Sequence, residues 1–289
     1  RRVPWWPVIS LLGTFSAGKS SFINGYLGAE LQRTGNQAVD DRFTVICYSD
    51  EDEARTLPGT AVDADLRFPF YRISGDIEDV AAGEGRRINN YLQLKTCNAE
   101  RIRGKILLDS PGFDADSQRS ATLQITDRII DLSDLVLVFF DARHPEPGAM
   151  RDTLRHLVSD TIGRDDASKF VFVLNQIDTT AREDNPEDVV AAWQRALASS
   201  GLTAGRFLRI YDEDSAPPIA DEALAKRFKA KKDADMAELH RRMTGIEVDR
   251  AYRVVEMMTG AARTLAGDTG VGRLKECLGQ WRRRVGVFD

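Results

Sequence analysis

Cysteine and histidine are scarce in this chain, and long apolar runs are absent. Its 289 residues include three cysteines, Cys47, Cys97 and Cys277, and three histidines. An odd number of cysteines without Cys-x-x-Cys spacing predicts neither a disulfide framework nor a zinc site, and the histidines are scattered. The longest apolar run, Leu135 to Phe140, has the length of a strand, whereas a bilayer span needs about 20 residues. We therefore expect a reduced, cytoplasmic setting.

A strong excess of either charge is also missing. The formal net charge is −5 and charged residues make up 29% of the chain, so we do not expect a surface that coats nucleic acid. Hydrophobic residues make up 42%, which is enough for one main core and a smaller attached unit.

Six short apolar runs divide most of the chain. They are rich in β-branched and aromatic residues, and helical or mixed segments separate several of them. The runs are Val8–Leu12, Phe43–Tyr48, Ile106–Leu108, Leu135–Phe140, Phe170–Leu174 and Phe207–Tyr211. Because they lack polar alternation, they predict an α/β fold with a doubly wound, mostly parallel sheet covered on both faces. In such a sheet the ligand lies beyond the carboxyl ends of the strands.

The residues after the first of these runs form a phosphate-binding loop. Gly13 to Ser21 read Gly-Thr-Phe-Ser-Ala-Gly-Lys-Ser-Ser and lead into a helical stretch. The two glycines let the backbone N–H groups turn toward the phosphates, Lys19 brings its charge to the β- and γ-phosphates as a catalytic residue, and Ser20 can ligate Mg²⁺. The predicted nucleotide-binding residues of this loop are Gly13, Phe15, Ser16, Ala17, Gly18, Lys19, Ser20 and Ser21. A chance glycine-rich turn is the alternative.

The loop after Ile106–Leu108 reads Asp109-Ser110-Pro111-Gly112. Asp109 can hold a water of the Mg²⁺ shell, and Gly112 can offer its backbone N–H to the γ-phosphate and move when that phosphate leaves. An Asp-x-x-Gly string by itself is also an ordinary turn. Its position directly after a strand favours a nucleotide-sensing switch.

The loop after Phe170–Leu174 reads Asn175-Gln176-Ile177-Asp178. Asp178 can accept hydrogen bonds from N1–H and the 2-amino group of guanine, whereas adenine has neither donor. GTPases usually carry lysine in place of Gln176, and glutamine covers the base with a shorter stem and no charge. A turn that closes a strand is the alternative reading. These residues favour GTP bound with Mg²⁺, with ATP left open.

The phosphate loop and its flanks resemble the dynamin superfamily, and later segments resemble its EHD branch. Asp41–Val45 is similar to that branch's first switch, Leu57–Asp63 with Phe68-Pro69-Phe70 is similar to its Pro-Gly-x-Ala insertion, and Leu137–Ala142 is similar to its strand ending in Phe-Asp-Ala. The resemblance implies a nucleoside triphosphatase that self-associates through its nucleotide domain, assembles on membranes and remodels them. Since EHD members prefer ATP despite a similar base motif, an EHD-type ATPase remains an alternative.

The resemblance also implies roles near the γ-phosphate. Ser16 would lie against the bridging β–γ oxygen, and Phe15 stands where dynamins proper place a polar, water-orienting residue. EHD members carry Pro-Thr-Thr where this chain has Ala38-Val39-Asp40, which removes a hydroxyl that ligates metal and aligns water. Thr44 and Asp40 are the two candidate catalytic replacements. We expect slow or assembly-dependent hydrolysis, and a nucleotide-gated scaffold with little turnover is a second hypothesis.

The part of the chain beyond Ser215-Ala216-Pro217-Pro218 has a helical pattern. We expect a nucleotide-binding domain over residues 1–216 and a helical segment over 217–289, partly packed on that domain. From Asp221 onward, 15 Lys and Arg face 11 Asp and Glu. The basic residues, among them Lys226-Arg227 and Lys231-Lys232, suit anionic lipid headgroups or a solvated helix face. The resemblance favours lipid and a peripheral membrane location, and a regulatory GTPase unconnected with membranes is the third hypothesis.

Overall fold

A computed structural model of the chain describes residues 6–13, 17–33, 42–80, 82–112, 120–143, 167–178, 186–199, 206–213, 219 and 221–266. The chain divides into two compact units, Arg1–Thr244 and Gly245–Asp289. The first unit contains an eight-stranded sheet with its helices, and the long helix α8, Glu222–Ala266, passes from the first unit into the second.

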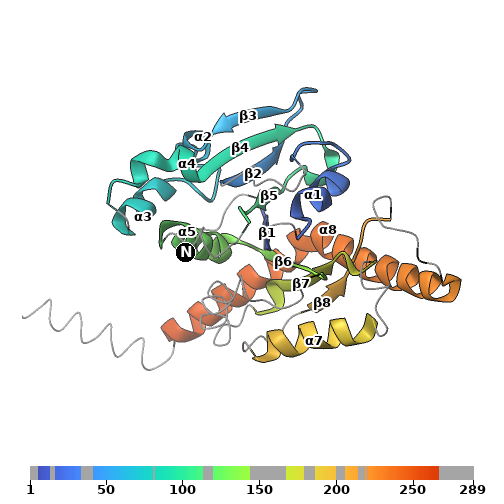
Figure 1. Cartoon of the computed structure of the whole chain (residues 1–289). Helices are drawn as coiled ribbons and strands as arrows, with labels where there is room; N and C mark the ends of the chain where they lie inside the picture. Colours follow the sequence, from blue (N-terminus) through green and yellow to red (C-terminus); the bar gives the residue numbers. More distant parts are fainter. Residues whose placement is uncertain are drawn as a thin grey trace, which may run out of the picture. The chain divides into compact units, whose positions relative to one another are not determined.

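The sheet has the strand order β3-β4-β2-β5-β1-β6-β7-β8 (Figure 1). The strands are β1 Val8–Gly13, β2 Phe43–Tyr48, β3 Arg55–Pro58, β4 Leu92–Cys97, β5 Ile106–Asp109, β6 Leu135–Asp141, β7 Phe170–Asn175 and β8 Arg206–Arg209. Strand β2 runs antiparallel to β5, as does β3 to β4, and the other neighbouring pairs are parallel. The predicted mostly parallel α/β sheet is therefore confirmed.

Helices connect most of the strands. They are α1 Lys19–Leu27, α2 Thr60–Asp63, α3 Ile73–Val80, α4 Ile88–Tyr91, α5 Ser120–Leu132, α7 Pro186–Ser199 and α8, with short 3₁₀ turns at Gly85–Arg87, Glu100–Ile102 and Ala167–Lys169. Helix α1 ends at Gly28, whose φ of 67° is left-handed and whose N–H donates to the carbonyl of Asn24, as is common at helix C-termini.

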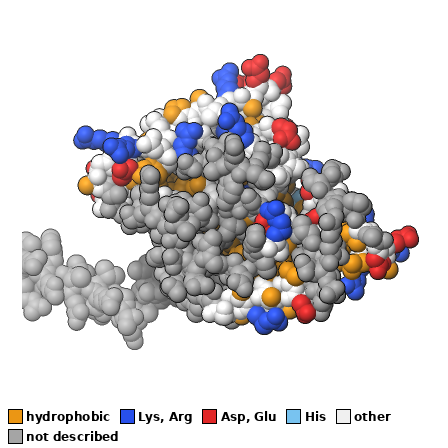
Figure 2. Space-filling model, viewed as in Figure 1, with side chains coloured by type: hydrophobic (Ala, Val, Ile, Leu, Met, Phe, Trp, Pro, Cys, Tyr) orange, Lys and Arg blue, Asp and Glu red, His pale blue; other side chains and the backbone are white. Residues whose placement is uncertain are grey.

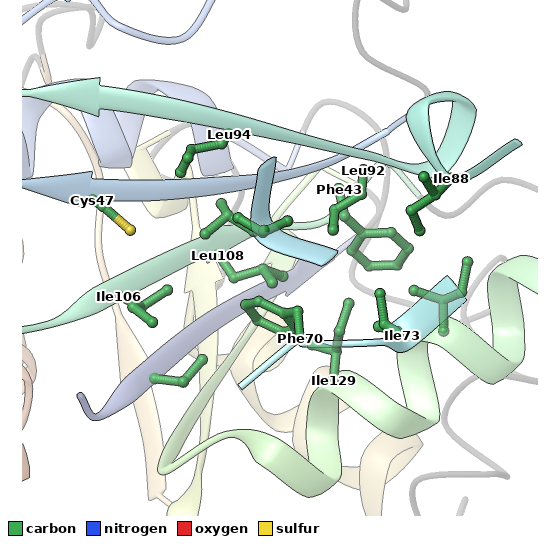
Figure 3. Close-up of a cluster of buried hydrophobic side chains, with 14 of the residues drawn as sticks. Phe43, Cys47, Phe70, Ile73, Ile88, Leu92, Leu94, Ile106, Leu108 and Ile129 are labelled. Carbon is green, nitrogen blue, oxygen red and sulfur yellow. The ribbon is translucent and has the colours of Figure 1, made fainter. Parts of the chain in front are cut away.

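Two buried clusters hold the sheet to its helices. In the first, side chains of β2, β4 and β5 meet Phe70 and residues of α3 and α5, with Phe43 and Ile129 among them (Figure 3). In the second, Trp193 of α7 is fully buried against β6 and β7, with its ring centroid 5.6 Å from that of Phe140. Cys47 and Cys97 are free and buried.

The part of α8 inside the first unit packs against α1 and β8. Leu239 and Met243 are fully buried, and the ring of His240 lies 5.8 Å from that of Tyr26 in α1. The carboxylate of Asp235 accepts a hydrogen bond from the backbone N–H of Arg209 in β8 at 2.9 Å. Residues 222–244 of α8 are thus part of the same unit as the sheet.

Candidate nucleotide-binding site

Strand β1 and helix α1 enclose the predicted phosphate loop, and two glycines fit its ends for different reasons. At Gly13, which pairs with Phe139 of β6, a Cβ atom would lie 2.7 Å from the Phe139 carbonyl oxygen. At Gly18, immediately before α1, φ is +82° and a Cβ atom would lie 2.1 Å from Nδ2 of Asn175. The close approach excludes a side chain at both positions, and at Gly18 the positive φ disfavours an L-residue as well.

Lys19 is buried at the start of α1 and bridges the phosphate loop. Its Nζ donates to the carbonyl oxygen of Gly13 at 3.1 Å. Burial lowers the pKa of Lys19 below its ordinary value, while the negative charge of Asp109 acts in the opposite direction. The ammonium group is therefore held at the carbonyl of Gly13, within electrostatic reach of the Asp109 carboxylate.

Asp109 ends β5, the strand beside β1, and pairs in register with Leu11. Its side chain is buried, and Oδ2 accepts a hydrogen bond from Nε2 of Gln32 at 2.7 Å. Oε1 of the same Gln32 amide accepts from Nζ of Lys95 at 2.5 Å. Sequence reasoning missed Gln32 and Lys95, because neither belongs to a recognisable motif.

Asn175, the last residue of β7, begins a loop that contacts the predicted phosphate loop. Its Nδ2 donates to the carbonyl oxygen of Ala17 at 2.9 Å, which joins residues 158 positions apart. Gln176 has a left-handed φ of 60°, and Asp178 is buried. The structure therefore brings the predicted base-binding loop, Asn175–Asp178, against the predicted phosphate loop.

Arg143, after β6, is a charged neighbour of this loop that sequence reasoning did not identify. Its guanidinium binds Asp141 with Nη2 to Oδ2 at 2.6 Å. Hydrogen bonds to Asp141 raise the pKa of Arg143 above its ordinary value, and the charge of Asp178 acts in the same direction. A guanidinium thus lies within electrostatic reach of the carboxylate predicted to read guanine.

The remaining predicted residues are placed as follows. Thr44 lies in β2 opposite Asp109, is buried, and accepts a hydrogen bond on its hydroxyl from Gln93 at 2.8 Å. Ser20 and Gly112 are half-buried, and Ser21 is exposed on α1. Phe15, Ser16 and Asp40 lie outside the described residues, so their predicted roles stay predictions.

The oxygen donors of this site suit Mg²⁺. In the described part of the chain, no group of three or more His, Cys, Asp or Glu is arranged to hold a metal ion. Mg²⁺ bound with a nucleotide needs fewer protein ligands, because phosphate oxygens and water complete its coordination shell beside one or two protein oxygens. The hydroxyl of Ser20 and the carboxylate of Asp109 are donors of this kind.

The basic residues at the start of α8 are largely paired. Arg227 binds Glu187, Lys229 and Lys232 bind Glu213, and Lys231 binds Asp235 at 2.9 Å. Basic and acidic side chains also lie interspersed on the face drawn in Figure 2. These pairs reduce the charge that the cluster can offer to an anionic lipid surface.

The strand, loop and helix around Lys19 follow the arrangement of P-loop nucleoside triphosphatases. The sequence profile of the dynamin family matches residues 9–177, and the chain belongs to this family. No curated protein matches the chain at a significant level. None of the described helices carries an apolar stretch long enough to cross a membrane.

Two solved structures are similar to this chain. Both come from work on an oligomerised bacterial dynamin pair, described as a mechanism for the long-range sensing and tethering of membranes. One has a TM-score of 0.55 and 13% sequence identity, and the alignment covers 96% of this chain and 45% of the other. The other has a TM-score of 0.48 and 15% sequence identity, and the alignment covers 96% of this chain and 46% of that one. This chain thus spans less than half the length of either structure, and the similarity concerns the fold.

Proposed function

We propose that this chain is the nucleotide-binding part of a dynamin-like GTPase that couples GTP binding and hydrolysis to assembly on membranes and to their remodelling. The observation that carries the proposal is the buried Lys19 inside a loop with a left-handed Gly18, beside Asp109 on the neighbouring strand. Membership of the dynamin family supports the same function.

Triphosphate binding would use this loop directly. Lys19 would exchange its hydrogen bond to Gly13 for the β- and γ-phosphates, and the N-terminus of α1 would face the same negative charge. Ser20 and Asp109 would hold Mg²⁺, which neutralises charge on the β- and γ-phosphate oxygens. Ser16 and the backbone N–H of Gly112 complete the proposed contacts to the γ-phosphate side.

Base selection would depend on Asp178. The contact between Asn175 and Ala17 fixes the predicted base-binding loop close to the phosphates, so that a nucleoside whose phosphates lie in the phosphate loop can reach Asp178. We propose GTP on this ground. ATP is the alternative, since Gln176 lacks the charge and length of the lysine usual in GTPases.

A nucleotide-gated scaffold with little hydrolysis is the second candidate function. The hydroxyl of Thr44 is engaged by Gln93 within the sheet, and the first switch has Asp40 where a metal-binding hydroxyl is usual. This arrangement favours slow turnover, which assembly of several copies would accelerate.

Membrane association and the EHD branch are the finer parts of the proposal. The family and the described action of the bacterial dynamin pair support self-association and peripheral binding to membranes. For the EHD branch, support comes from the sequence around Pro58-Gly59, which resembles that branch's Pro-Gly-x-Ala insertion. A Cβ atom at Gly59 would lie 2.5 Å from the Leu92 carbonyl oxygen, so this turn packs closely against β4.

One experiment separates the hypotheses. Phosphate release from GTP and ATP is measured with and without phosphatidylserine liposomes, together with binding by calorimetry. Lipid-stimulated release supports the membrane GTPase, tight binding without release supports the scaffold, and release that ignores lipid supports a GTPase unconnected with membranes. Lys19→Ala should abolish triphosphate binding, and the exposed Lys226→Ala is its control; unchanged affinity in Lys19→Ala would refute the location of the site.

A further inference from the structure

A buried chain of hydrogen bonds leads from Lys95 to Asp109 through one amide. Nζ of Lys95 donates to Oε1 of Gln32 at 2.5 Å, and Nε2 of Gln32 donates to Oδ2 of Asp109 at 2.7 Å. The three residues are 8%, 4% and 6% exposed in that order. They come from β4, from the segment after α1 and from β5.

The chemistry of Lys95 fixes which way the Gln32 amide faces. The oxygen and nitrogen of an amide are hard to tell apart by shape, but an ammonium group can only donate hydrogen bonds. The amide oxygen must therefore face Lys95, and the NH₂ group is directed to Asp109. A carboxylate that accepts this bond is held in one orientation.

The backbone of Gln32 is fixed to the helix that begins with Lys19. Oδ1 of Asn24 in α1 accepts from the N–H groups of Leu31 and Gln32 at 3.1 and 2.8 Å. Nδ2 of Asn24 donates to the carbonyl oxygen of Gln32 at 2.7 Å. The Gln32 side chain thus links the phosphate-loop helix to Asp109.

We propose that Gln32 is a positioning residue for the Mg²⁺-nucleotide site. It fixes the carboxylate of Asp109 beside Lys19, and Lys95 fixes Gln32 in turn. The inference rests on the proposed function, in which Asp109 holds the Mg²⁺ shell. It adds two residues to the site that touch neither metal nor nucleotide.

The test compares Gln32→Met, which keeps the side-chain length, with the wild-type chain. A fluorescent GTP analogue is titrated in EDTA and at increasing Mg²⁺, so that nucleotide affinity and Mg²⁺ dependence are measured separately. A bond to a charged group is lost, so the Mg²⁺ concentration for half-maximal binding should rise roughly tenfold. Affinity in EDTA should stay within about twofold, since the loop contacts of Lys19 are retained.

Two further variants complete the test. Lys95→Met and the double variant with Gln32→Met should shift the Mg²⁺ dependence no further than Gln32→Met alone, because the two residues act as one unit. Ser133→Ala removes a different buried bond, Ser10 to Ser133 at 2.6 Å, and should lower thermal stability without changing Mg²⁺ dependence. An unchanged Mg²⁺ dependence in Gln32→Met, or multiplying effects in the double variant, would overturn the inference. If the wild-type chain itself bound no triphosphate, the proposed function would fail first.

Discussion

Replacing Gly18 with alanine tests the geometry of the phosphate loop. The backbone there has φ of +82°, which costs an L-residue about 1–2 kcal/mol. The new Cβ atom would also lie 2.1 Å from Nδ2 of Asn175, so the Asn175 amide must leave its bond to Ala17. Loss of that buried hydrogen bond adds about 1–3 kcal/mol. The free energy of unfolding should therefore fall by roughly 2–5 kcal/mol, and triphosphate affinity should fall with it.

Gly25, inside helix α1, provides a matched control. A Cβ atom there has no neighbour within 4 Å, so Gly25→Ala should raise the free energy of unfolding by about 0.5–1 kcal/mol through better helix propensity. Urea unfolding gives the stabilities, and calorimetry gives the GTP affinity of each variant. A Gly18→Ala chain as stable as the wild type, with unchanged affinity, would show that Asn175 does not lie against the loop.

Three further predictions concern the base, the core and pH. Asp178→Asn should weaken GTP binding by about 1–3 kcal/mol and leave ATP almost unchanged; calorimetry showing equal losses would mean that the base is read elsewhere. Trp193→Ala should cost about 3–5 kcal/mol of unfolding free energy, and Trp193→Phe much less, because the indole N–H has no hydrogen-bond partner among the described residues. Burial lowers the pKa of His240 below 6.5, so the unfolded chain takes up the proton first: stability should be complete above about pH 6.5 and fall as pH drops through the folded pKa. Urea unfolding from pH 7.5 to 5 should show this fall, and His240→Phe should flatten it; equal slopes would exclude His240 as the cause.

Six of the eight strands could be predicted from the sequence, because runs of apolar residues mark them. Each of the six apolar runs falls on a strand, although β8 begins one residue earlier and ends two residues before the run does. Strands β3 and β4 were not predicted. All four residues of β3 are exposed, and β4 places Gln93 and Lys95 among its apolar residues, so neither reads as a core strand.

The residues of the site also differ in whether the sequence could predict them. Lys19, Asp109 and Asn175 belong to short motifs whose meaning depends on residues next to them in the chain. Gln32 and Lys95 have no such motif, because their role arises from contacts across 77 and 63 residues. Arg143 follows the predicted strand Leu135–Phe140, but only the folded chain brings its charge near Asp178.

The contact between Tyr26 and His240 joins helix α1 to helix α8. This helix begins with Lys19, and its penultimate residue, Tyr26, lies against the long helix α8. Arg101 also contacts this tyrosine, since its guanidinium donates a hydrogen bond to the Tyr26 backbone carbonyl oxygen at 2.9 Å. If a γ-phosphate bound in the proposed site displaced Lys19, helix α1 would connect that displacement to Tyr26 and so to α8. Loss of that phosphate would reverse the displacement.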